Sequence, residues 1–214
     1  MRVRRLSTRA NPRLTAGVDE AGRGPLAGPV YAAAVLFPPG VRVHGLRDSK
    51  QLTPQERERL TPRIERAALA WAVAWSDVAE IDRVNILQAT LLAMRRAVDR
   101  LPVRPAHVQV DGCCLPVIRG ASAEAIVDGD CKVAAISAAS ILAKVYRDEE
   151  MRRLHALYPE YGFAEHKGYA TLAHLNALAR LGPSPIHRES FAPVRASLQA
   201  QFWLPEAIAE ALQP

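Results

Sequence analysis

Two adjacent carboxylates, Asp19 and Glu20, follow an apolar run and precede the loop Gly22-Arg23-Gly24-Pro25. Carboxylate oxygens are the ligands that hard divalent cations such as Mg²⁺ and Mn²⁺ prefer. Glycine backbone beside an arginine can approach a phosphate or a sugar closely. Together these residues supply parts that metal-assisted cleavage of a phosphodiester requires.

Two further acids lie beside glycine after apolar runs. The runs His107–Gly112 and Ala125–Asp130 are predicted as strands that carry Asp111 and Asp130 at their ends. An acid followed by glycine is commonly a turn residue, and for any one segment alone that interpretation is favoured. The three segments together favour a shared site, where two ions about 3.5–4 Å apart would bind the acids.

The adjacency of Asp19 and Glu20 poses a geometric difficulty. Neighbouring side chains on a regular strand point to opposite faces of the sheet. Both acids can therefore reach one ion only if the strand is interrupted. Gly22 and Gly24 make such an interruption plausible, and we expect one here.

The elements that must position the acids follow from hydrophobic periodicity. Ala16–Phe37 predicts two strands around a glycine-containing loop, and the second is apolar enough to be covered on both faces. Another strand is expected over residues 69–76. Helices are expected after the capping box Thr53-Pro54-Gln55-Glu56, over residues 86–101, over Val133–Leu157 and over Thr171–Arg180. Pro62 is expected to kink or split the first helix.

This alternation of strands and helices predicts an α/β fold with a mixed sheet. Ligands of such sheets bind at the carboxyl ends of the strands, which is where Asp19, Asp111 and Asp130 are expected. Residues 1–13 carry five arginines and are predicted to be a basic flexible arm. The catalytic domain is expected over residues 14–198, with a tail over 199–214.

The composition is that of an ordinary globular protein, with 49% hydrophobic and 23% charged residues. No apolar run approaches the roughly 18–20 residues that span a bilayer, and no secretory signal is evident. The three cysteines, Cys113, Cys114 and Cys131, do not form a disulfide framework, so a reducing cytoplasm is expected. The net charge of +6 is compatible with a polyanionic partner.

Motifs across nearly the whole chain, from about residue 14 to 196, resemble ribonuclease HII, the bacterial type 2 ribonuclease H. The matching segments are Gly17–Val30, Asp48–Leu52, Asn85–Leu87, Val110–Gly112, Gly129-Asp130, Ser137–Lys144, Arg147-Asp148, Tyr161–Phe163, His166–Tyr169 and His187-Arg188. The resemblance implies a ribonuclease H-like mixed sheet flanked by helices, with a helical C-terminal part. It implies cleavage of RNA in RNA–DNA hybrids and incision 5′ to single ribonucleotides in duplex DNA, for ribonucleotide removal and primer processing.

The resemblance also implies roles for particular residues. Asp19, Glu20, Asp111 and Asp130 fall on the metal-binding and catalytic acids, which would hold two Mn²⁺ or Mg²⁺ ions. Gly22, Arg23 and Gly24 fall on the loop that would read the ribose 2′-hydroxyl and the flanking phosphate, and Tyr169 falls on the junction-sensing tyrosine. Because the 2′-hydroxyl distinguishes RNA from DNA, a close-fitting glycine loop is physically reasonable for this task.

Further contacts are expected with less support from the residues themselves. Lys50 and Lys144 are candidate phosphate contacts, while His166, Lys167 and His187 are candidate groove-lining residues. Tyr169 is equally compatible with a core aromatic role. Asp128 adds negative charge beside Gly129-Asp130, and spacing favours Asp130 over Asp128 as the fourth acid.

Two alternative functions remain open from the residues. In the first, a nucleic-acid-binding module without catalysis uses the acids only as turn residues. In the second, a different two-metal nuclease cuts all-DNA substrates. A monomer is expected from the resemblance. The run Gln201-Phe202-Trp203-Leu204 suggests a sliding-clamp contact, although a packed terminal helix is the favoured interpretation.

Overall fold

The computed structural model describes residues 11–46 and 52–202 of the 214-residue chain. The contacts divide the chain into two compact units. The first unit contains residues up to Arg23, 29–76 and 86–147, and the second contains residues 24–28, 77–85 and those from Asp148 onward. Lys50 lies outside the described residues, so its predicted phosphate contact has no position in the structure.

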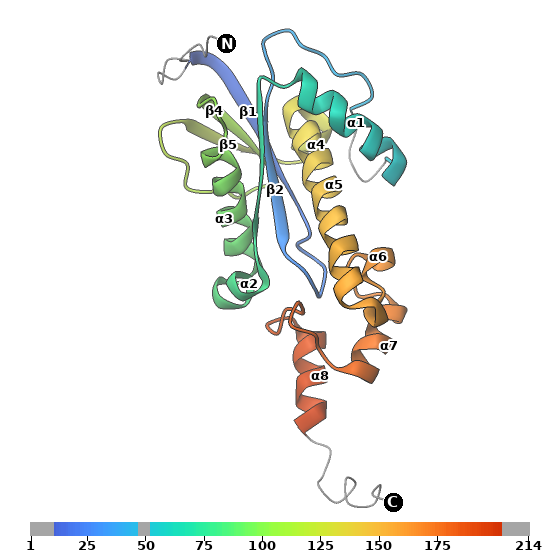
Figure 1. The fold of residues 1–214 in the computed structure, drawn as a ribbon. Helices are drawn as coiled ribbons and strands as arrows, with labels where there is room; N and C mark the ends of the chain where they lie inside the picture. The colour runs from blue at the N-terminus through green and yellow to red at the C-terminus, as the bar shows by residue number, and fades with distance from the viewer. Residues whose placement is uncertain (1–10, 47–51, 203–214) are drawn as a thin grey trace, which may run out of the picture. The chain divides into compact units, whose positions relative to one another are not determined.

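The first unit is built on a five-stranded mixed sheet, as the sequence predicted (Figure 1). Its strand order is β3-β2-β1-β4-β5. The strands are β1 (Asn11–Ala21), β2 (Val30–Leu36), β3 (Ala70–Ser76), β4 (Pro105–Asp111) and β5 (Ser122–Ile126). Strands β1, β2 and β3 pair antiparallel, whereas β4 pairs parallel with both β1 and β5. The carboxyl ends of β1 and β4 therefore meet at one edge of the sheet.

Helices cover both faces of this sheet (Figure 1). They are α1 (Pro54–Ala67), α3 (Ile86–Asp99), the short α4 (Gly129–Lys132) and the first part of α5 (Ala134–Leu157). Helix α3 packs on β1, β2 and β3, while α1 and α5 cover the opposite face. All of β2 is buried, which confirms the prediction of a strand covered on both sides.

Helix α1 continues through Pro62, so of the predicted kink or split the split is wrong. The carbonyl that loses its hydrogen bond to a proline belongs to the residue four positions earlier, here Glu58. Glu58 and Pro62 are both exposed, so water can solvate that carbonyl. The predicted capping box is present, with Thr53 and Glu56 each accepting from the other's backbone N–H.

The second unit is largely helical, as predicted for the C-terminal part. It contains α2 (Val78–Val84), the 3₁₀ helix η1 (Pro159–Tyr161), α6 (Phe163–His166), α7 (Leu172–Leu181) and α8 (Ala192–Phe202). Its core includes Ala27, Met151, Tyr161 and Phe163.

Two element boundaries differ from the sequence-based division of the chain. Strand β1 begins at Asn11, inside the predicted arm, and α8 continues to Phe202, inside the predicted tail. Among the described helices, none combines the length and the apolar character needed to cross a membrane. All three cysteines are free thiols.

Candidate active site

Asp19 and Asp111 lie on neighbouring parallel strands. The register pairs Val18 of β1 with Val110 of β4, so the following residue on each strand is an aspartate. Adjacent strands are about 4.8 Å apart, and paired residues of a parallel ladder project to the same face. The structure therefore brings together two acids that are far apart in the sequence.

The position of Asp130 corrects the predicted third strand. Strand β5 ends at Ile126, and Asp130 lies in the first turn of α4 rather than at a strand end. Asp128 precedes α4 with a left-handed φ of 54°, which reverses the chain. This turn directs the backbone N–H groups of Gly129 and Asp130 at Asp111 Oδ1, at 2.7 and 3.4 Å.

These contacts favour Asp130 over Asp128 as the companion of Asp111. Asp130 is 8% exposed, and its backbone N–H is one of the two that point at Asp111 Oδ1. Asp128 is exposed. A Cβ added to Gly129 would lie 3.2 Å from Asp111 Oδ1 and 2.7 Å from Ile136 Cδ1. Glycine therefore permits α4 to pack closely against the end of β4.

Strand β1 ends at Ala21, just before Gly22, so the chain is not interrupted between the two adjacent acids themselves. Pairing with β2 continues through Asp19, Glu20 and Ala21. Asp19 is buried, and Glu20 is partly buried, with its carboxylate 3.4 Å from Arg23 Nη1. The negative charge of Asp111 nevertheless acts on both acids.

The site concentrates negative charge in a buried environment. Burial raises the pKa of Asp19 well above its usual value, and the charges of Glu20 and Asp111 raise it further. The Ser140 hydroxyl opposes this shift through a hydrogen bond. Burial also raises the pKa of Glu20, against the lowering effect of Arg23. Buried carboxylates that repel one another are a favourable environment for a cation.

The donor set fits a hard divalent cation, because the acids offer only carboxylate oxygens. Within the described part of the chain, no three acidic, histidine or cysteine side chains already form an assembled metal cluster. Mg²⁺ usually takes only one or two protein carboxylates, with water and substrate phosphate as its other ligands. Neighbouring acids on β1 and β4 satisfy that smaller requirement.

Gly22 has a structural reason to be glycine. Its φ is +98°, and a Cβ at this position would lie 1.9 Å from Nε of the fully buried Arg147. Arg147 Nε in turn donates to the carbonyl of Pro29, 3.2 Å away, at the other end of the loop. The guanidinium group of Arg147 therefore supports the backbone that carries Arg23.

One face of α5 contributes residues whose roles the sequence analysis missed. Ser140 reaches Asp19 and Arg147 lies beneath Gly22. Lys144 is four residues after Ser140 and three before Arg147, so it lies on the same helix face. The three- and four-residue spacing that joins Ser140, Lys144 and Arg147 was the available signal for a functional face.

Gly24 and Tyr169 lie side by side within the second unit. A Cβ on Gly24 would be 3.7 Å from Tyr169 Cε1, and the tyrosine is 44% exposed. Backbone hydrogen bonds fix this segment, including one of 2.8 Å from Leu26 N–H to the Gly168 carbonyl. The prediction that His187 lines a groove is wrong, because its side chain is only 2% exposed. His166 and Lys167 are only half-buried, so their predicted place in a groove stays a prediction.

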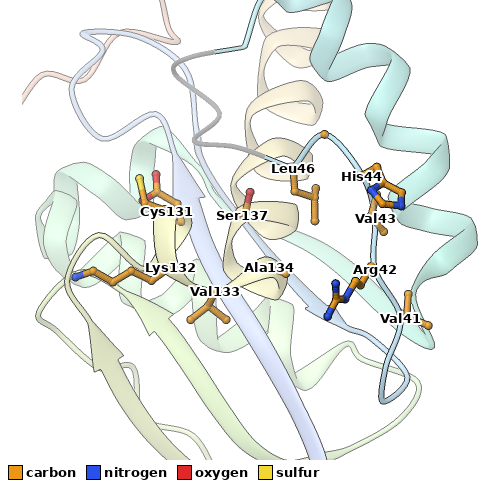
Figure 2. Close-up of a pocket in the computed structure, with 12 residues that line it drawn as sticks. Val41, Arg42, Val43, His44, Leu46, Cys131, Lys132, Val133, Ala134 and Ser137 are labelled. Carbon is orange, nitrogen blue, oxygen red and sulfur yellow. The ribbon is translucent and has the colours of Figure 1, made fainter.

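A separate cavity of about 640 Å³ lies beside Asp130 (Figure 2). Val41–Leu46 line one side, and Cys131–Ala134 with Ser137 line the other. Arg42 and Lys132 give the cavity a basic lining. Asp130 is one of the lining residues, whereas Asp19, Glu20 and Asp111 are absent from the lining, so the cavity adjoins the acidic site through Asp130 alone.

Acids at the ends of adjoining strands, beside a glycine-arginine loop on a mixed sheet, define a nuclease-like hydrolase. The chain matches the family model described as Ribonuclease HII over residues 16–194. A relative named Ribonuclease HII, from Thiobacillus denitrificans, is 60% identical over 195 residues, covering 91% of this chain and 95% of the relative. The chain belongs to the ribonuclease HII family, and it is a metal-dependent endoribonuclease.

Solved structures agree with this assignment. Ribonuclease H2 from Pyrococcus horikoshii OT3 superposes with a TM-score of 0.74 and 28% identity, covering 89% of this chain and 99% of that one. Ribonuclease HII from Archaeoglobus fulgidus, solved in complex with PCNA, gives a TM-score of 0.71 and 25% identity, covering 85% and 96%. The predicted fold class is therefore confirmed.

Proposed function

We propose that this ribonuclease H, which cleaves the RNA of RNA–DNA hybrids, also incises 5′ to single ribonucleotides embedded in duplex DNA. The products would carry a 3′-hydroxyl and a 5′-phosphate, as required for ribonucleotide removal and primer processing. The observation that carries the proposal is the side-by-side placement of Asp19 and Asp111 at the carboxyl ends of β1 and β4.

Asp19, Glu20, Asp111 and Asp130 would hold two Mg²⁺ or Mn²⁺ ions. When bound, such ions acidify the attacking water and neutralise charge on the departing 3′-oxygen. The protein contributes the fixed orientation of its acids. Backbone N–H groups of α4 hold Asp111 Oδ1, and the Ser140 hydroxyl holds Asp19.

The Gly-Arg-Gly loop is proposed to recognise the ribonucleotide. The Arg23 side chain is half exposed, and its Nη1 lies 3.4 Å from the Glu20 carboxylate. Its guanidinium group is proposed to bind the flanking phosphate from this exposed side, while the backbone near Gly24 approaches the 2′-hydroxyl. Lys144 is proposed to contact a phosphate from the α5 face that carries Ser140.

Tyr169 is proposed to contact the sugar at the junction between ribonucleotide and DNA. Its exposure beside Gly24 supports this role over that of a core aromatic. In this scheme the 2′-hydroxyl is read rather than used as a nucleophile. The reaction should therefore release no 2′,3′-cyclic phosphate.

One assay tests the proposal. A labelled DNA duplex with a single ribonucleotide is incubated with Mg²⁺ or Mn²⁺, beside an RNA–DNA hybrid and an all-DNA duplex. We expect EDTA-sensitive cleavage of the first two substrates and an intact all-DNA control. Cleavage of the all-DNA duplex would instead support a general two-metal nuclease, and a cyclic phosphate would exclude the proposed chemistry.

The partner predictions remain proposals. We propose a monomer whose C-terminal end contacts a sliding clamp, and the PCNA complex of the archaeal relative supports that contact. Gln201 and Phe202 belong to α8, while Trp203 and Leu204 lie outside the described residues. Clamp binding measured before and after deletion of residues 203–214 tests the contact.

A further inference from the structure

Two buried histidines in the second unit share a hydrogen bond. His174 is fully buried and His187 is 2% exposed, and their Nε2 atoms are 3.0 Å apart. The rings also pack against Phe163. Two nitrogens can share one proton only if one donates and the other accepts, so the Nε2 atom of one of the two rings must be unprotonated.

The surrounding hydrogen bonds fix both tautomers. The backbone N–H of Ser184 donates to His187 Nδ1 at 2.9 Å, so that nitrogen accepts, also from the Ser184 hydroxyl 2.8 Å away, and Nε2 carries the proton. His187 Nε2–H then donates to His174 Nε2. The remaining proton of His174 is on Nδ1, which donates to the backbone carbonyl of Tyr169 at 2.9 Å. The histidine relay, meaning His187 and His174, thus runs from Ser184 to Tyr169.

A third imidazole reinforces the same segment. The Gly168 N–H donates to His166 Nδ1 at 3.2 Å, which leaves His166 Nε2–H to donate to the Tyr161 carbonyl at 2.7 Å. The His166 ring stacks on His174, with centroids 4.4 Å apart and planes 13° apart. The backbone on both sides of Lys167 is therefore tied to imidazoles.

Protonation would break the relay. A second proton on His174 would sit on Nε2 and face the Nε2–H of His187. A second proton on His187 would sit on Nδ1 and face the backbone N–H of Ser184. The titratable side chains in ring contact with the relay are His166 and Tyr161. Burial, followed by the charge of His174, lowers the pKa of His187 to about 4. Burial also lowers the pKa of His174.

We propose that His174 and His187 are positioning residues for Tyr169, because their relay fixes the tyrosine's carbonyl and thereby holds its ring beside Gly24. The inference rests on the proposed contact of Tyr169 with substrate. His174 itself touches no substrate group in this account. Its effect on the reaction should therefore pass through Tyr169.

A double-mutant cycle tests this dependence. His174→Phe keeps an aromatic ring but removes the donor, whereas the amide nitrogen of His174→Asn can replace Nδ1. On the single-ribonucleotide duplex we expect His174→Phe to lower kcat/KM about tenfold, the scale of one lost hydrogen bond. His174→Asn should recover most of that loss. In the Tyr169→Ala background, His174→Phe should cost nothing further.

An equal loss in both backgrounds, or a His174→Asn variant as slow as His174→Phe, would overturn the positioning role. Thermal unfolding of each variant separates loss of folded protein from loss of rate. If Tyr169→Ala leaves cleavage of every substrate unchanged, the substrate role of Tyr169 is wrong, and with it the functional part of the inference.

The relay itself is measurable in the unaltered protein. Long-range ¹H–¹⁵N correlation spectra at neutral pH should show His187 protonated at Nε2 and His174 protonated at Nδ1. The opposite tautomers, or a charged ring in either residue, would contradict the relay whatever the variants do. This spectrum therefore distinguishes failure of the relay from failure of the proposed function.

Discussion

The acidic edge and the histidine relay are both buried polar groups, but their interactions are satisfied to different degrees. At the acidic edge (Asp19, Glu20, Asp111 and Asp130), burial and mutual repulsion raise the pKa values of Asp19 and Glu20. In the relay, each ring nitrogen has a hydrogen-bond partner. The first arrangement needs a cation to become favourable, and the second is complete without one.

Binding free energy is available at the acidic edge and not at the relay. A buried polar network that is fully satisfied specifies one geometry and gains nothing from a ligand. Carboxylates held together in a partly desolvated site gain when a divalent ion arrives. The comparison assigns chemistry to the acidic edge and positioning to the relay, and the following predictions test each side of it.

The largest expected effect comes from Asp111→Asn. Removing this charge while keeping the shape should lower kcat by roughly 10³-fold, equivalent to about 4 kcal/mol of lost transition-state stabilisation. Duplex binding in a gel-shift assay should persist, because the proposed phosphate contacts come from other residues. Asp128→Asn removes an exposed neighbouring charge and is the matched control. A fast Asp111→Asn enzyme would remove Asp111 from the mechanism.

The relay should make stability depend on pH. His187 has a folded pKa of about 4, below its usual value of 6.5. Between these values the unfolded chain binds more protons, so the free energy of unfolding falls as the pH is lowered from 6.5 to 4. The full shift corresponds to about 3 kcal/mol. Urea titrations should show a shallower pH dependence for His187→Gln, and an unchanged one for the exposed control His44→Gln.

Two glycine substitutions separate steric contact from backbone strain. Gly22 and Gly40 both have positive φ, but only a Cβ at Gly22 meets another group, Arg147. Gly40→Ala should cost about 1 kcal/mol from the left-handed conformation alone. Gly22→Ala should cost about 1–3 kcal/mol more because of overpacking. Equal destabilisation of Gly22→Ala and Gly40→Ala in urea would show that the Arg147 side chain moves aside at little cost.

The smallest expected effect is a gain in stability from Asp19→Asn. Because the folded pKa of Asp19 is raised, its ionised form destabilises the fold above the ordinary aspartate pKa. Without divalent ions at pH 7, the neutral amide should raise Tm by a few degrees, roughly 2–4 °C for each kcal/mol of repulsion removed. Activity should be lost. A lower Tm would mean that the carboxylate is already well compensated.

Local patterns predicted most of the sheet and the residues at its edge. Apolar runs that end in an acid identified β1 and β4 correctly, and the capping box at Thr53 identified the start of α1. The strand prediction over Ala125–Asp130 failed because Asp128, which precedes Gly129 as in a common turn, adopts a left-handed conformation. Its chain reversal converts a predicted strand end into α4.

Long-range packing explains what the sequence did not predict. Pro62 was expected to disrupt α1, yet solvent exposure of the affected turn makes the missing hydrogen bond tolerable. His174 and His187 form a hydrogen bond across thirteen residues of sequence. Neither histidine has a periodic or motif signal that joins it to the other. Such pairings arise only when the helices and loops around them are assembled.

Direct measurement of divalent-ion binding tests the central claim that the acidic edge binds a cation. Titration of the protein with Mn²⁺, followed by the electron paramagnetic resonance signal of the free ion, requires neither substrate nor turnover. The account predicts uptake by the unaltered protein and by Asp128→Asn, with strongly weakened uptake by Asp19→Asn and Asp111→Asn. Equal Mn²⁺ binding by all four proteins would contradict it.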